Sequence, residues 1–312
     1  MKTAFLFPGQ GAQVVGMGVE IARTFVVAAE IYQKADNILG FDLSKICFEG
    51  PAEQLNTTAI SQPAIFVTSA AILEVLRTEP ATCQITPDVT AGLSLGEYTA
   101  LYAAGVIGFE HALTLVAKRG QAMQAAAEMK EGVMVSIIGL DEDKINQLCA
   151  EASEGELLDA VNFNCPGQTV VSGSKAACQR VEKLAEKYGA IKAVRLEVAG
   201  AFHTQMMSSA ADALEEALKK TEISEPSDVK IIANINAEYY KEGSEIAQGL
   251  IKQLTNAIYW QKCMEKLIAE RIENFYEIGP GRVLTGLMRR INRKTKVINV
   301  GTLQAINELL NR

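Results

Sequence analysis

Short apolar runs alternate with longer segments of helical spacing along the chain. Residues 4–7 are an apolar run, residues 88–92 are centred on Val89-Thr90-Ala91, and each of the two segments predicts a short strand. Residues 63–77, 95–104 and 109–128 carry apolar side chains at the three- and four-residue spacing of helices. Strands that alternate with helices favour a mainly parallel sheet covered on both faces, and therefore an α/β fold.

The middle of the chain has a different order of elements. Strand, helix, strand, strand, helix and strand are predicted in turn at 133–138, 141–152, 157–163, 169–172, 175–188 and 191–198. Asp141 is expected to cap the first helix, and Pro166-Gly167 to form the turn between the two middle strands. Because this is the order of a ferredoxin-like unit, we expect a small domain of residues 129–198 inserted into a larger domain of residues 1–128 and 199–312.

Composition and charge narrow the class of protein. The chain has 312 residues, of which 48% are hydrophobic and 21% charged, as is typical of a globular protein whose core needs no disulfides. The net charge of −7 argues against general binding to nucleic acid or to an anionic membrane. The six cysteines form no CxxC motif or Cys/His cluster, so we expect reduced thiols and no metal site.

No targeting or membrane segment is predicted. The apolar run at the start is too short for a signal peptide, and no stretch is seen to approach the ~20 apolar residues of a spanning helix. These features predict a cytoplasmic enzyme.

A candidate nucleophile lies in Gly92-Leu93-Ser94-Leu95-Gly96, which fits G-x-S-x-G. The motif follows a predicted strand and opens a predicted helix, and a sharp turn between them would project the serine hydroxyl outward. The helix start would also place free backbone N–H groups beside a developing oxyanion. The alternative is a glycine-rich turn with an incidental serine.

A serine nucleophile needs a base, and the chain has two histidines. His111 falls on the polar side of the 109–128 helix and is interpreted as solvated. His203 lies between a predicted strand and a helix, in a loop at a sheet edge, and is the candidate base. No carboxylate close to it in sequence is an obvious partner, so a distant one or a backbone carbonyl would orient the ring.

Arg119 falls on the apolar stripe of its helix, three residues after Val116 and four before Met123. A guanidinium on a core-facing side is costly unless an anion meets it, and its planar fork suits a carboxylate. The structural alternatives are a salt bridge, for example to Glu97, or a side chain that reaches the surface. Beside a serine acyl-transfer site, Arg119 would predict an acyl group that ends in a carboxylate.

These residues belong to a set of motifs, spread over essentially the whole chain, that resembles the malonyl-CoA–acyl carrier protein transacylases of bacterial fatty-acid synthesis. The motifs are Phe7-Pro8-Gly9-Gln10-Gly11-Ala12-Gln13, Gly92-Leu93-Ser94-Leu95-Gly96-Glu97-Tyr98, Arg119-Gly120 with Met123-Gln124, Asn162-Phe163-Asn164-Cys165-Pro166-Gly167-Gln168, Gly200-Ala201-Phe202-His203, Gln253-Leu254, and Gly279-Pro280-Gly281 with Leu284.

The resemblance implies an α/β-hydrolase-like large domain with an inserted ferredoxin-like small domain. It makes Ser94 the nucleophile and His203 the base. By the same resemblance the backbone carbonyl of Gln253 orients His203, and Arg119 binds the malonyl carboxylate. The remaining roles it implies are the oxyanion hole, from the backbone N–H groups of Gln10 and Leu95, and further substrate contacts from Met123, Asn162 and Phe202.

Two positions depart from the family pattern. Leu93 stands where the family often has histidine, and is expected to alter the polarity of the pocket while leaving the chemistry intact. Ala257 stands where the family often has proline, and is expected to loosen the loop that orients His203.

The resemblance also implies a reaction and its partners. Malonyl would pass from malonyl-CoA to Ser94, and then to the phosphopantetheine thiol of acyl carrier protein, in a ping-pong sequence that needs no cofactor or metal. Residues 282–296 hold six basic residues, including Arg289 and Arg290, and no acid. They are a candidate docking surface for an acidic carrier protein, the alternative being a solvated helix face. A monomer is expected.

Three other functions stay open at this point. A discrete acyltransferase of a polyketide synthase would use the same chemistry with another carrier. A serine esterase or thioesterase would share Ser94 and His203 but gives no reason for Arg119. A non-catalytic binding module would have an inert turn serine.

Overall fold

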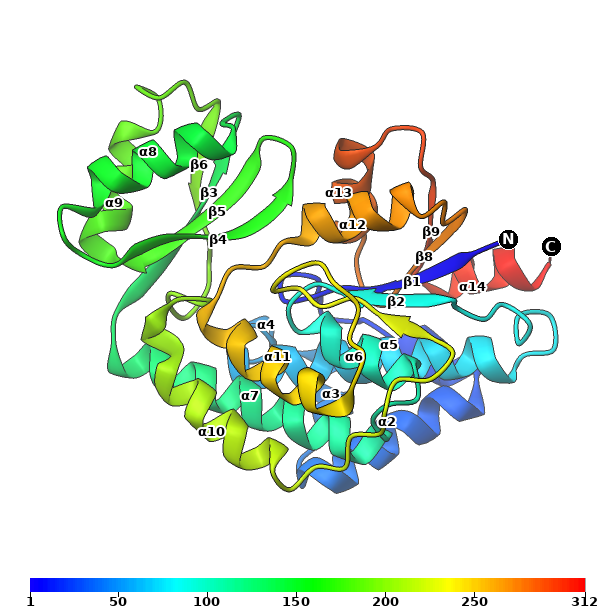
Figure 1. Cartoon of the computed structure of the whole chain (residues 1–312). Coiled ribbons are helices and arrows are strands. Elements are labelled where there is room, and N and C mark those ends of the chain that lie inside the picture. Colours follow the sequence, from blue (N-terminus) through cyan, green and yellow to red (C-terminus); the bar gives the residue numbers. More distant parts are fainter. Residues whose placement is uncertain (312) are drawn as a thin grey trace.

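The computed structural model describes residues 1–311, which form two sheets with helices around them (Figure 1). The strands are β1 (Thr3–Phe7), β2 (Val89–Gly92), β3 (Gly132–Ile138), β4 (Leu158–Cys165), β5 (Gln168–Ser174), β6 (Lys192–Arg195), β7 (Lys230–Ile231), β8 (Asn274–Ile278) and β9 (Val297–Val300). The helices are α1 (Val19–Thr24), α2 (Val26–Leu39), α3 (Leu43–Glu49), α4 (Ala52–Leu55), α5 (Thr58–Thr78), α6 (Gly96–Ala103), α7 (Phe109–Met129), α8 (Glu142–Ser153), α9 (Lys175–Leu184), α10 (Ser208–Leu218), α11 (Gly243–Thr255), α12 (Trp260–Ala269), α13 (Val283–Ile291) and α14 (Leu303–Leu310), with a 3₁₀ turn η1 (Gln205–Met207).

The larger sheet has the order β7-β2-β1-β8-β9, and every pair in it is parallel. Helices α5, α6 and α7 lie on one side of this sheet, and α12 and α13 on the other (Figure 1). The side chains of strand β1 show why helices must pack against both faces of the sheet. Phe5 and Phe7 pack into one core cluster while Ala4 and Leu6 pack into the second, because successive side chains of a strand point to opposite faces. The predicted parallel α/β sheet is confirmed.

Helix α5 corrects two sequence-based expectations. It begins at Thr58, a turn before the predicted start at 63, so that Pro63 lies inside it. Its 21 residues are long and apolar enough for a membrane-spanning helix by length and composition alone, so the prediction that no stretch approaches this length is wrong. In the structure 83% of its apolar window is buried, which makes α5 a core helix of the large domain.

The smaller sheet is antiparallel and has the order β4-β5-β3-β6. With α8 and α9 packed against it, the chain order and strand order are those of the predicted ferredoxin-like unit. The side chain of Asp141 accepts from the Lys144 N–H at 2.9 Å, which confirms the predicted helix cap. The boundaries of the two domains at 128/129 and 198/199 stay a prediction.

The small domain is joined to the large one by more than its two connecting segments. Ile258, which follows α11, donates its N–H to the Val161 carbonyl at 2.7 Å and accepts the N–H of Phe163 at 2.9 Å. The rings of Phe163 and Tyr259 stack at 5.2 Å with an interplanar angle of 6°. Strand β4 of the small domain is therefore joined to Ile258 and Tyr259 of the large domain by two backbone hydrogen bonds and a stacked ring pair.

Candidate active site

Ser94 occupies the sharp turn that the motif predicts between β2 and α6. Its φ is 50°, a left-handed conformation that is rare for a residue other than glycine and that strains the backbone. The flanking glycines permit the turn, because a Cβ at Gly92 would lie 1.8 Å from the carbonyl carbon of Gly96, and one at Gly96 would lie 2.1 Å from the carbonyl oxygen of Phe7.

Asn234 fixes this turn from a loop far along the chain. Its Oδ1 accepts the Ser94 N–H at 2.6 Å, and its Nδ2 donates to the Gly92 carbonyl at 2.7 Å. The side chain is fully buried. Both backbone groups of the turn are thereby satisfied without water, which holds the strained conformation in place.

His203 lies beside Ser94. Its Nε2 is 3.1 Å from the Ser94 Oγ, and its Nδ1 is 2.7 Å from the backbone carbonyl of Gln253. That carbonyl can only accept, so Nδ1 carries the proton and Nε2 is left free to accept one from the serine. Burial, followed by the charge of Arg119, lowers the pKa of His203 to about 4, while the bond to Gln253 opposes the shift. The imidazole is therefore neutral at pH 7.

The other histidine, His111, is exposed on α7, as the sequence predicted.

Arg119 extends from the middle of α7 and is 1% exposed. Its Nη2 donates to the Ser94 Oγ and to the Gln253 Oε1, both at 2.9 Å, and its Nη1 donates to the Gln62 Oε1 at 2.6 Å. Burial lowers the pKa of its guanidinium, with Tyr98 and then Glu97 opposing, yet an arginine keeps its charge at neutral pH. Within residues 1–311 its Nε has no hydrogen-bond partner, and no carboxylate lies within 4.0 Å of its guanidinium nitrogens. The predicted alternatives of a salt bridge to Glu97 and of a surface position are both wrong.

Two backbone N–H groups beside the serine lack partners within the described chain. Those of Gln10 and Leu95 donate no hydrogen bond to residues 1–311. The loop that carries Gln10 abuts the serine turn, since a Cβ at Gly9 would lie 2.3 Å from the Leu93 carbonyl oxygen. Both residues line the cleft at Ser94. Free N–H groups at this position suit an oxyanion.

The cleft at Ser94 has a volume of about 740 Å³, within the range of ligand sites, and is lined by residues of both domains. Met123 and Phe202 line it from the large domain and Asn162 from the small one, as the sequence predicted. Leu93 lines it as well. Of the residues described, no group of three or more His, Cys, Asp or Glu side chains could hold a metal ion.

Three contributors to the site were not predicted from the sequence. They are Asn234, the side chain of Gln62 and the side chain of Gln253. Gln62 holds Arg119 and also donates to the Met123 Sδ at 3.4 Å. All three side chains are fully buried, and only Asn234 lies within an apolar run that could have marked it in the sequence.

The two candidate docking arginines differ in their surroundings, although both are exposed on α13. Arg290 donates to the Gln168 Oε1 of the small domain at 2.9 Å. Gln168 lines the cleft at Ser94, whereas Arg289 lines a separate hollow that it shares with Arg293 and Lys296. Within the part of the chain that the structure describes, none of the six basic residues at 282–296 is paired with a carboxylate.

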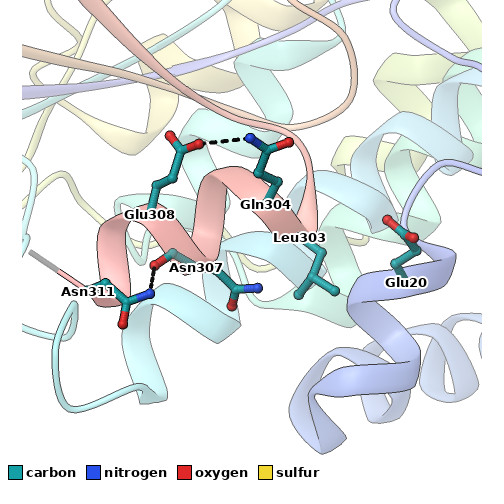
Figure 2. A pocket seen from close by; sticks show the side chains of 6 residues that line it. All are labelled: Glu20, Leu303, Gln304, Asn307, Glu308 and Asn311. Atoms are coloured by element: carbon teal, nitrogen blue, oxygen red, sulfur yellow. Dashed lines mark hydrogen bonds between the residues drawn. The ribbon is translucent and has the colours of Figure 1, made fainter.

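A further hollow lies between α14 and the start of α1 (Figure 2). Two hydrogen bonds lie along its α14 wall, from the Gln304 side chain to Glu308 at 3.0 Å and from the Asn311 side chain to the Asn307 carbonyl at 2.7 Å. It holds no histidine, cysteine or serine, and shares no residue with the cleft at Ser94. The candidate catalytic residues Ser94 and His203 line the cleft and not this hollow.

Comparison with known proteins agrees with this geometry. Residues 4–305 match the family described as the acyl transferase domain. The malonyl CoA-acyl carrier protein transacylase of Bacillus subtilis (strain 168) is 42% identical over 98% of this chain and 95% of its own length. That of Escherichia coli (strain K12) is 40% identical over 98% and 96%.

Solved structures give the same result. The acyl-carrier-protein S-malonyltransferase of Bartonella henselae has a TM-score of 0.95 and 38% identity over 100% of this chain and 99% of that one. A malonyl-transacylase in complex with its type II polyketide synthase acyl-carrier protein has a TM-score of 0.95 and 36% identity over the same shares.

Proposed function

Because this chain belongs to the acyl transferase domain family, we propose that it transfers malonyl from malonyl-CoA to the phosphopantetheine thiol of an acyl carrier protein. The observation that carries the proposal is the contact between Arg119 and Ser94. A buried guanidinium with no carboxylate partner in the described chain lies 2.9 Å from the hydroxyl oxygen. It suits an acyl group whose own carboxylate lies only a few bonds from the reacting carbonyl, as in malonyl.

In the first half-reaction Ser94 attacks the malonyl thioester while the His203 Nε2 accepts its proton. The oxyanion that forms accepts hydrogen bonds from the free backbone N–H groups of Gln10 and Leu95. The carbon–sulfur bond then breaks, coenzyme A leaves with the proton from His203, and malonyl stays on Ser94 as an ester.

In the second half-reaction the thiol of the carrier protein gives its proton to His203 and attacks the ester. The new thioester forms as the bond to the Ser94 Oγ breaks, and His203 returns the proton to that oxygen. The backbone carbonyl of Gln253 holds the ring in one tautomer through both steps. One thioester replaces another, so the chemistry balances without ATP.

Selectivity follows from Arg119. Its carboxylate-binding N–H groups are buried, so an acetyl group would leave them without an anionic partner. Phe202 and Met123 are further members of the cleft wall, and Asn162 reaches it from the small domain. We propose these three as substrate contacts.

The test is intact-mass measurement after mixing the enzyme with malonyl-CoA or acetyl-CoA. Wild type gains a malonyl adduct, which disappears when carrier protein is added. Ser94→Ala gains none, and Arg119→Ala no longer prefers malonyl to acetyl. A malonyl adduct on Ser94→Ala, or loss of the adduct to water as fast as to the carrier, would overturn the proposal.

The similarity to a malonyl-transacylase that serves a type II polyketide synthase favours a second candidate, in which the carrier belongs to such a synthase. A panel of fatty-acid and polyketide carrier proteins distinguishes the two by the rate of the second half-reaction. Several expectations from the sequence stay predictions. They are the cytoplasmic location, the monomeric state, the absence of a cofactor or metal, the absence of binding to nucleic acid or membrane, and the loosening effect of Ala257.

A further inference from the structure

Glu97 is a fully buried carboxylate behind the site, and the mechanism above makes no use of it. Its Oε1 accepts from the Tyr240 hydroxyl at 2.5 Å. Its Oε2 accepts from the Gln253 Nε2 at 2.7 Å and from the Asn234 N–H at 3.3 Å. All three neighbours are donors, so the carboxyl group acts as a fixed acceptor at the centre of a buried network.

The side-chain amide of Gln253 connects this network to Arg119. Its Oε1 accepts from the guanidinium, while its Nε2 donates to Glu97 and, at 3.1 Å, to the Ser94 carbonyl. Rotating the amide by half a turn would set its N–H₂ against the guanidinium and its oxygen against two acceptors. One orientation of Gln253 is therefore compatible with all of its neighbours.

Glu97 acts on Arg119 through this amide and not by direct pairing. The two side chains form no salt bridge within 4.0 Å in the described chain. Of the two bonds that Gln253 Nε2 donates, the one to Glu97 is the shorter. Without Glu97, the amide would keep only the longer bond on that side, and Asn234 would lose the acceptor of its buried N–H.

We propose that Glu97 is a positioning residue for substrate selection, which fixes the Gln253 amide and, through it, the guanidinium of Arg119 in the place where a malonyl carboxylate binds. The inference rests on the proposed function. It gives Glu97 a role in the recognition of the carboxylate of the acyl group, which is separate from the proton transfer by His203.

The experiment measures single-turnover acylation of Ser94 by malonyl-CoA and by acetyl-CoA across substrate concentration. Glu97→Ala is expected to raise the half-saturating concentration of malonyl-CoA by about tenfold, the cost of leaving a buried donor unpaired. The maximal rate and the reaction with acetyl-CoA are expected to stay near wild type, because His203 and its carbonyl partner are untouched.

Two further variants separate positioning from a loss of folding. Glu97→Gln keeps an acceptor oxygen for Gln253 and Asn234, with its amide N–H₂ turned to the Tyr240 hydroxyl, and should restore the wild-type preference. Tyr240→Phe removes a donor from the other carboxylate oxygen and leaves the bond to Gln253 intact, so it is the matched control and should also keep the preference.

Equal losses with malonyl-CoA and acetyl-CoA in Glu97→Ala would overturn the inference, as would failure of Glu97→Gln to restore the preference. Wild type and Ser94→Ala are run beside them. Absence of a malonyl adduct on wild type would instead reject the proposed function, so the two failures are distinguishable.

Discussion

The guanidinium of Arg119 donates a hydrogen bond to the hydroxyl oxygen of Ser94, across 2.9 Å. Ser94 lies in the turn between β2 and α6, Arg119 lies in α7, and the two residues are 25 positions apart in the chain. The proposed carboxylate-binding group thus lies next to the proposed nucleophile, which would limit the distance between the carboxylate and the carbonyl of a bound substrate.

Replacing Arg119 should change the selection of substrate more than the chemistry. In Arg119→Ala, acylation by malonyl-CoA is expected to fall about ten- to hundredfold, the range for hydrogen bonds to a charged group. Acylation by acetyl-CoA should change far less, because acetyl offers no carboxylate. The measurement is single-turnover acylation with each thioester. Arg119→Lys keeps the charge and loses the planar fork, so an intermediate value is expected. A parallel fall for both substrates would contradict this role.

The pH dependence of acylation should report the desolvated imidazole of His203. Its pKa of about 4 in the folded protein lies below the ordinary value of 6.5. The neutral, proton-accepting form therefore persists as pH falls past 6.5, and kcat/KM for malonyl-CoA should decline only as pH approaches 4. The measurement is the rate of acylation by malonyl-CoA in quenched reactions at a series of pH values from above 6.5 down to about 4. An acid limb centred at 6.5 would show that the ring is not desolvated.

The same shift has a consequence for folding. Between pH 6.5 and about 4 the unfolded chain binds a proton at His203 that the folded chain does not. The free energy of unfolding should therefore decrease as pH falls through this window. Urea unfolding of wild type and of His203→Gln is measured at pH 6.5 and near pH 4. The decrease in the free energy of unfolding between these two pH values should be smaller in the variant, which lacks the imidazole.

Gly96→Ala should destabilise the protein because the added Cβ would lie 2.1 Å from the carbonyl oxygen of Phe7, where backbone meets backbone. A cost of roughly 1–3 kcal/mol or more is expected, as for other overpacked positions. Gly108→Ala is the matched control, since its φ is −69° and no atom lies within 4 Å of the added Cβ. Denaturant unfolding of both variants compares them, and equal stability would refute the close approach.

Arg289→Glu should weaken transfer to an acidic carrier protein while leaving acylation by malonyl-CoA unchanged. Long-range attraction is screened by salt, so the defect should shrink as ionic strength rises. Arg290 is the poorer probe because its bond to Gln168 joins α13 to the small domain. Lys220→Glu, an exposed residue beyond the end of α10, carries the same charge change and serves as the control. Equal loss in both half-reactions would reject docking at α13.

The sequence predicted much of the fold because the periodicity of apolar residues is local information. The small domain shows this, since alternation and turn residues were enough to place β3 to β6 in a ferredoxin-like order. The spacing of apolar residues placed the start of helix α5 at 63, later than the observed start at Thr58, and Pro63, a residue typical of a helix start, lies inside the helix. Tertiary packing of a nearly all-buried helix outweighs the lost hydrogen bond.

The site was predictable where one residue carries a visible anomaly. Ser94 lies between glycines after a strand, and Arg119 interrupts an apolar stripe. The partners of these residues were not predictable in this way. Gln62 is 57 positions from Arg119 and Asn234 is 140 positions from Ser94, so only the folded chain brings them together. The local sequence around each of these amides does not show which residue its side chain will contact.

Position 253 divides its two duties between main chain and side chain. Every amino acid has a backbone carbonyl, so the hydrogen bond to His203 does not depend on which residue occupies this position. The hydrogen bond to Arg119 requires the side-chain amide. A substitution at position 253 would therefore change the proposed acyl selectivity and leave the proposed base in place, so the two properties could be altered one at a time by mutation.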